Sequence, residues 1–113
     1  MDNTKSDLYY IARIIDDLKL IIANTKGVDK GGLESNTLLC DSVLFRIIQI
    51  SENAARLTDS FLSEHSEIQW RAIRGMRNRI VHHYGEVDLE VVYTTVTDDI
   101  PDLLELLSNL DIK

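Results

Sequence analysis

The sequence predicts an all-α protein, an antiparallel bundle of four to five helices forming a single domain over residues 1–113. Apolar residues recur at three- and four-residue spacing along most of the chain, and the alternation typical of strands is nearly absent. Hydrophobic residues make up 44% of the 113 residues, which suffices for one core. The segments between the periodic stretches are short, and short connections favour antiparallel neighbours.

The first helix is expected from about Thr4 to Asn24, because seven apolar residues repeat there with helical spacing: Leu8, Ile11, Ile14, Ile15, Leu18, Ile21 and Ile22. Gly27 predicts its end. Gly31 and Gly32 follow closely, so this segment is expected to be a mobile loop.

A second helix is expected from about Asn36 to Ser60, with Ser35 or Asn36 as its N-cap. Its predicted buried side consists of Leu39, Val43, Ile47, Ile50, Ala54 and Leu57, widened by Leu38, Phe45 and Ile48. Gln49, Glu52, Asn53 and Arg56 form a polar stripe that we expect to face solvent.

Ser66 and Gln69 match a capping box, which predicts a third helix from Ser66 to about His83 with Gly85 as its C-cap. Asp88 is the expected N-cap of a fourth helix, whose apolar stripe continues to Leu110. This helix is predicted to be kinked or split at Pro101, which has no amide donor. Asp98 or Asp99 could then cap its second part.

Charge is unevenly distributed along the chain. The net charge is −7, which argues against broad, nonspecific nucleic-acid binding. Between residues 65 and 84, however, four arginines and all three histidines accompany a single acid. This segment indicates either a local site for an anionic ligand or a basic helix that pairs with acidic neighbours.

Arg77 breaks the pattern of the third helix. At about 100° per residue it falls in the middle of the apolar face formed by Trp70, Ile73, Ile80, Val81 and Tyr84. A buried, unpaired guanidinium costs several kcal/mol, so Arg77 should meet a carboxylate, reach a wet cleft or bind an anion. The structural alternative is a buried ion pair with Glu52 or another acid of the second helix.

A polar flank adjoins Arg77 and consists of Arg71, Arg74, Asn78 and His82. An imidazole can transfer a proton near neutral pH, and an arginine can hold a phosphate in two hydrogen bonds. These groups suit RNA cleavage without a metal, in which the ribose 2′-hydroxyl attacks the adjacent phosphate. No metal site is predicted, because His82 and His83 are adjacent and point apart, and no cofactor is expected.

The stretch from Trp70 to Tyr84 resembles the signature of HepT-like proteins of the HEPN superfamily, which is Arg, four residues, His, one residue, Tyr. Here it appears as Arg77-Asn78, His82 and Tyr84. The segments 47–55, 87–93 and 99–103 resemble the same family.

The resemblance implies a helical homodimer in which two motif helices meet at a shared cleft. It implies an RNase toxin of a toxin–antitoxin pair, with Arg77 stabilising the scissile phosphate, His82 acting as acid and base, and Asn78 supporting both. An MntA-like minimal nucleotidyltransferase would be the antitoxin and would attach AMP to Tyr84. Arg71, Arg74 and Arg79 are candidate RNA contacts.

Two other functions stay open on the sequence alone. The chain could be a non-catalytic substrate-binding or regulatory partner of a nucleotidyltransferase, or an acidic helical dimer without activity. No apolar run reaches the length of a membrane span, no secretory signal precedes the first helix, and Cys40 is the single cysteine. A cytoplasmic protein is therefore expected.

Overall fold

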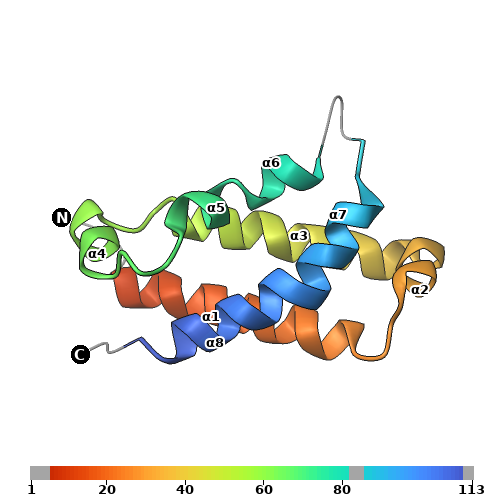
Figure 1. The fold of residues 1–113 in the computed structure, drawn as a ribbon, viewed down its shortest axis with the longest axis horizontal. Coiled ribbons are helices and arrows are strands. Elements are labelled where there is room, and N and C mark those ends of the chain that lie inside the picture. Colours follow the sequence, from red (N-terminus) through yellow and green to blue (C-terminus); the bar gives the residue numbers. More distant parts are fainter. Residues whose placement is uncertain (1–5, 82–85, 111–113) are drawn as a thin grey trace.

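Helices joined by short turns make up nearly all of the computed structural model, which describes residues 6–81 and 86–110 (Figure 1). In chain order the elements are α1 (Asp7–Thr25), α2 (Lys30–Ser35), α3 (Thr37–Ala54), α4 (Asp59–Glu64), α5 (Trp70–Arg74), α6 (Met76–Ile80), α7 (Leu89–Thr94), the π-helical turn η2 (Thr95–Asp99) and α8 (Ile100–Ser108). Helices α1 and α3 run antiparallel, α5 and α6 pass back over α3, and α7–η2–α8 returns across α1 (Figure 1). The predicted all-α antiparallel bundle is confirmed.

Helix α1 forms close to the predicted range, but it begins at Asp7 and not near Thr4, and Leu8 of the predicted apolar stripe is 43% exposed. The Ser6 side chain accepts a hydrogen bond from the Tyr9 amide and caps its first turn. Ile14 and Leu18 are completely buried on the side that packs against α3 and α8. Asp17 on the same helix is also buried and forms an ion pair of 2.9 Å with Arg46 of α3. This pair adds a charged link between α1 and α3 beside the apolar contacts.

The predicted mobile loop around Gly31 and Gly32 is wrong, because both glycines lie in helix α2. The Asp29 carboxylate accepts a hydrogen bond of 2.7 Å from the Gly32 amide and caps this helix. Leu33 is buried and holds α2 on the core. A local cap and one buried anchor therefore outweigh the low helix propensity of the two glycines.

The second predicted helix is shorter than expected. Asn36 is its N-cap, as predicted, but α3 ends at Ala54 and α4 begins separately after Thr58. The Thr58 hydroxyl accepts a hydrogen bond from the Phe61 amide, and the backbone amide of Thr58 donates to the Asp7 carboxylate. These contacts stabilise a new helix start instead of a continuation.

Two residues assigned to the buried side of α3 face solvent. Leu38 is 84% exposed and Phe45 is 55% exposed. Asn53 of the predicted solvated stripe is buried instead, whereas Glu52 and Arg56 are exposed as expected. The core contacts only one side of α3, so the apolar pattern was wider than the buried face.

Asp88 caps α7 as predicted, by accepting a hydrogen bond from the Val91 amide. The fourth helix is split next to Pro101 as predicted, because the π turn η2 separates α7 from α8 and Pro101 falls in the first turn of α8. The wider turn accommodates the missing proline amide. The predicted second cap is wrong, because Asp99 is in the helical conformation and makes no capping bond.

None of the helices within residues 6–81 and 86–110 is both long and apolar enough to cross a membrane.

Candidate functional site

The start of α5 is fixed by Trp70, not by the predicted capping box at Ser66. The indole Nε1 of Trp70 donates a hydrogen bond of 2.9 Å to the carbonyl oxygen of His65, and the indole is 7% exposed. Ile68 is buried beside it. These contacts hold residues 65–69 in tight turns, so the helix begins four residues later than predicted.

The motif segment is interrupted at Gly75, between α5 and α6. The Ser51 hydroxyl of α3 donates a hydrogen bond of 3.0 Å to the carbonyl oxygen of Ile73. In an uninterrupted helix this carbonyl would accept from the amide of Arg77, four residues later. The buried hydroxyl therefore gives the Ile73 carbonyl a hydrogen-bond partner at the place where the helix is interrupted.

The interruption changes which side chains face the core. Met76 is 2% exposed and packs in the core together with Ile73 and Ile80. Arg77 faces solvent. The prediction that Arg77 lies in the middle of the apolar face is thus wrong, because that prediction assumed one continuous helix across Gly75.

Arg77 is not locked in a buried ion pair with Glu52. Both side chains are exposed, and in the described ranges no carboxylate lies within ion-pair distance of the Arg77 guanidinium. Its Nη1 donates a hydrogen bond of 3.2 Å to Oδ1 of Asn78. The structure therefore brings Arg77 and Asn78 together at the surface, where the guanidinium is accessible to an anion.

The other candidate RNA contacts, Arg71, Arg74 and Arg79, are also exposed. Four arginines thus project from the eleven-residue segment 70–80 that contains α5 and α6. Arg79 pairs loosely with Asp99 of η2, with 3.9 Å between Nη2 and Oδ2 and both side chains about half exposed. A long, exposed ion pair contributes little to stability, so Arg79 can exchange Asp99 for another anion.

The chain leaves the helix directly after α6. Val81 is extended and pairs with Val87 in an antiparallel bridge, and the Asp88 amide donates a hydrogen bond of 2.9 Å to the Ile80 carbonyl. The helix was predicted to continue to His83, but α6 ends at Ile80 because Val81 is already extended. His82, His83, Tyr84 and Gly85 lie outside the described residues, so the structure places the motif only at its arginine side and at Val81 and Glu86, the residues next to 82–85.

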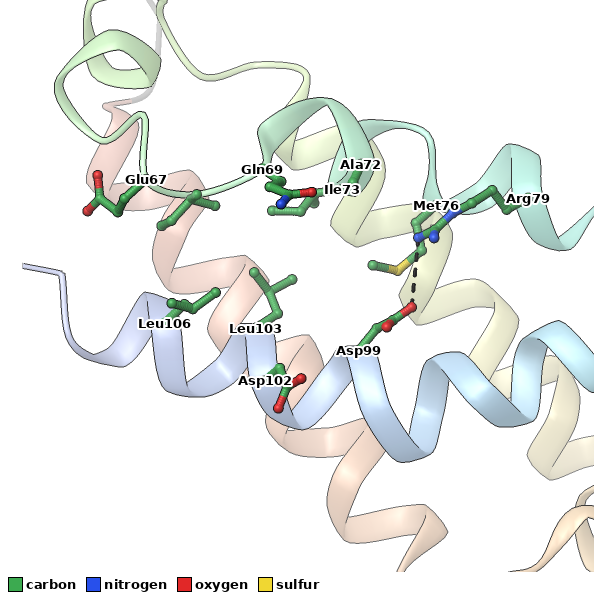
Figure 2. A pocket seen from close by; sticks show the side chains of 11 residues that line it. Glu67, Gln69, Ala72, Ile73, Met76, Arg79, Asp99, Asp102, Leu103 and Leu106 are labelled. Carbon is green, nitrogen blue, oxygen red and sulfur yellow. Dashed lines mark ion pairs between the residues drawn. The ribbon is translucent and has the colours of Figure 1, made fainter.

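A pocket of about 380 Å³ lies between the motif segment and α8 (Figure 2). Its walls combine apolar and polar side chains from α5–α6, the preceding turn, η2 and α8: Glu67, Ile68, Gln69, Ala72, Ile73, Met76, Arg79, Asp99, Asp102, Leu103 and Leu106. The Arg79–Asp99 pair closes one end of this pocket (Figure 2).

Sequence reasoning missed three residues that shape this site. Ser51 was not singled out, and nothing in the sequence of α3 shows that its hydroxyl reaches the motif segment. Met76 was passed over because its burial depends on the interruption at Gly75. Asp99 was noticed as a cap, although its carboxylate pairs with Arg79.

The arrangement defines a helical protein with an exposed arginine cluster on its motif segment. The family model described as "Ribonuclease HepT-like" matches residues 12–110. The chain belongs to this HepT-like family, which confirms the resemblance read from residues 70–84. The predicted enzyme class, an endoribonuclease, is the class that this family represents.

Individual relatives carry related descriptions. "Putative RNase TTE0752" from Caldanaerobacter subterraneus subsp. tengcongensis is 26% identical over 83% of this chain and 84% of its own length. "Probable ribonuclease HepT" from Thermococcus cleftensis is 37% identical over 58% of this chain and 64% of its own length. "Putative RNase MJ1380" from Methanocaldococcus jannaschii is 24% identical over 89% and 90%, respectively. No solved structure matches.

Proposed function

We propose that this chain is a metal-independent endoribonuclease and the toxin of a toxin–antitoxin pair. The observation that carries the proposal is the exposed Arg77, whose guanidinium is bonded to Asn78 and to no carboxylate within the described ranges. Membership in the HepT-like family supports it. The whole chain would act as one domain, in the cytoplasm, where its RNA substrate is found.

The proposed reaction is transfer of the phosphodiester to the neighbouring ribose. The 2′-hydroxyl gives up its proton and attacks the phosphorus, the bond to the 5′ oxygen breaks, and that oxygen takes up a proton. His82 would serve as acid and base in these transfers. Arg77 would bind the non-bridging oxygens and stabilise the charge that develops there.

Asn78 would orient Arg77, since their side chains are already hydrogen-bonded. Arg71, Arg74 and Arg79 would contact neighbouring phosphates. Such contacts make binding salt-dependent, and they supply a local attraction for RNA on a chain whose net charge is −7.

The protein would act as a homodimer in which two motif segments share one cleft. Two large apolar side chains on the outer side of α3, Leu38 and Phe45, support an oligomer, because they are 84% and 55% exposed in the single chain. They lie seven residues apart and therefore on the same side of the helix.

Regulation would come from an MntA-like nucleotidyltransferase that attaches AMP to Tyr84. The added phosphate carries negative charge beside the arginine cluster and would repel RNA while occupying space near it. Incubating the two proteins with ATP should increase the toxin's mass by one AMP, and Tyr84→Phe should prevent this while leaving RNA cleavage intact.

The decisive experiment measures cleavage of a labelled RNA by the purified protein in the presence of EDTA. Arg77→Ala and His82→Ala should each abolish cleavage without changing the helical circular dichroism spectrum. Arg56→Ala, which removes an exposed arginine of another segment, is the matched control and should remain active. Cleavage by both motif variants would reject the proposal, and a wild-type protein that binds but never cleaves RNA would instead favour a non-catalytic binding partner.

A further inference from the structure

We propose that the pocket between α5–α6 and α8 holds one unstacked base of the RNA, and that Asp99 selects bases carrying an exocyclic amino group. This inference rests on the proposed function and specifies how the same site recognises its substrate. The observation behind it is a pocket of about 380 Å³ with apolar and polar walls, which Arg79 lines and which phosphate binding alone would not require.

The pocket suits a flat ring better than a phosphate. Ile73 and Met76 line one wall and Leu103 lines the other (Figure 2). Apolar side chains on both walls match the two faces of a base, and pockets of this size accommodate small ligands. Three carboxylates among the lining residues disfavour an anion inside, so the phosphate would remain outside with the arginines.

A cationic side chain of a protein partner is a weaker candidate for the same space. Arg79 already lies at one end of the pocket and partly neutralises Asp99. A second cation in the pocket would be repelled by the charge of Arg79, whereas a neutral base would not be repelled.

Asp99 is placed to accept from a base. Its carboxylate reaches Arg79 only at 3.9 Å and is 43% exposed. An amino group such as N4 of cytosine donates to a carboxylate, whereas uracil presents an acceptor oxygen at the same position. A base amino group would replace Arg79 as the partner of Asp99 and release the guanidinium to the adjacent phosphate.

The pocket is linked to the motif through α6, because Arg79 lines the pocket and follows Arg77 by two residues on this short helix. Residues two apart on a helix point to different sides, so the two arginines would contact different phosphates of a strand that passes around α6. The base beside the phosphate bound by Arg79 would then enter the pocket.

The test compares binding of 2′-O-methyl oligocytidine and 2′-O-methyl oligouridine, neither of which can be cleaved. At C4 of the ring, cytosine carries an amino group and uracil carries a carbonyl oxygen. Fluorescence anisotropy should show about tenfold tighter binding of oligocytidine, which is the size expected for one hydrogen bond to a charged group. Asp99→Asn should remove this preference by weakening oligocytidine binding about tenfold, to the level of oligouridine, because the charged acceptor is lost.

Two further variants separate base selection from structural effects. Asp98→Asn removes an exposed neighbouring carboxylate that does not line the pocket and should keep the wild-type preference. Leu106→Ser changes a half-exposed lining residue and should weaken both oligonucleotides alike.

Equal binding of the two oligonucleotides by the wild-type protein would overturn the inference, as would an unchanged preference in Asp99→Asn. Free cytidine monophosphate that binds as tightly as the oligonucleotide would overturn it too, since the pocket would then be a nucleotide site and not part of a strand-binding surface. Because no cleavage is measured, an inactive protein that still prefers oligocytidine would refute the nuclease proposal and leave base selection supported.

Discussion

The hydroxyl of Ser51 donates a hydrogen bond of 3.0 Å to the carbonyl oxygen of Ile73, and both residues are buried. This contact joins the middle of the bundle to the motif segment. It satisfies a carbonyl that would otherwise accept from the amide of Arg77 in a continuous helix. The Ile73 carbonyl thus keeps a donor where the helix is interrupted and Arg77 faces solvent, and we expect this contact to help hold that arrangement.

Ser51→Ala should destabilise the protein by about 1–3 kcal/mol, because the buried Ile73 carbonyl loses its donor. RNA cleavage should fall as well, since α5 and α6 are then free to join and turn Arg77 toward the core. Urea unfolding and a cleavage assay measure the two effects. Ser42→Ala, a half-buried serine on the same helix, should change neither, and full activity of Ser51→Ala would contradict this role.

Gly75→Ala should be tolerated. The backbone at Gly75 has φ −92°, which any residue adopts, and an added Cβ would lie 3.4 Å from the Arg71 carbonyl oxygen. We expect a gain of about 0.4–1 kcal/mol from the lower entropy of the unfolded chain. Gly27, with φ +76°, is the contrasting position, where alanine should destabilise by about 1–2 kcal/mol in thermal unfolding. A Gly75→Ala variant that is less stable than Gly27→Ala would show that the turn needs glycine for another reason.

The buried-side ion pair between Asp17 and Arg46 and the exposed pair between Asp99 and Arg79 should contribute differently to stability. Asp99→Ala should change the free energy of unfolding by less than about 1 kcal/mol, because its pair with Arg79 is long and half exposed. Asp17→Ala should cost about 1–3 kcal/mol, because it leaves the partly buried Arg46 without its carboxylate partner. Chemical denaturation of both variants in one buffer compares them, and equal losses would contradict the difference in burial.

The double variant Leu38→Ser and Phe45→Ser should shift the protein toward the monomer. Both side chains are exposed in the single chain, so removing them costs the fold little while it removes apolar area from the proposed dimer. Light scattering after size-exclusion chromatography measures the mass. Leu20→Ser, at a 41% exposed residue of α1, is the control, and an unchanged dimer in the double variant would place the interface elsewhere.

Cys40 should react slowly with iodoacetamide in the native protein. Partial burial raises the pKa of its thiol, and the nearby Asp41 carboxylate raises it further. A raised pKa means less thiolate at pH 8, so alkylation should be slower than for free cysteine and should increase as the pH rises above 9. Unfolding in urea should bring the rate up to that of free cysteine; a native rate equal to the unfolded one would contradict the effect of burial.

The sequence by itself determined the helical class, the buried stripe of α1 apart from Leu8, and the caps at Asn36 and Asp88. These features depend on neighbours three or four residues apart, and such neighbours are visible in a linear pattern. The sequence also determined the family, because the motif arginine, asparagine, histidine and tyrosine stand at fixed spacing within residues 70–84.

Only the tertiary structure decided which way Arg77 faces and where the pocket lies. The hydroxyl that bonds the Ile73 carbonyl beside the interruption comes from Ser51, 22 positions earlier in the sequence, and the carboxylate that meets Arg79 comes from the π turn before Pro101. A helical wheel assumes one continuous axis, and contacts between distant segments decide whether that axis continues. The residues that carry the chemistry could thus be read from the sequence, but their orientation required the packing of α3 and α8 against them.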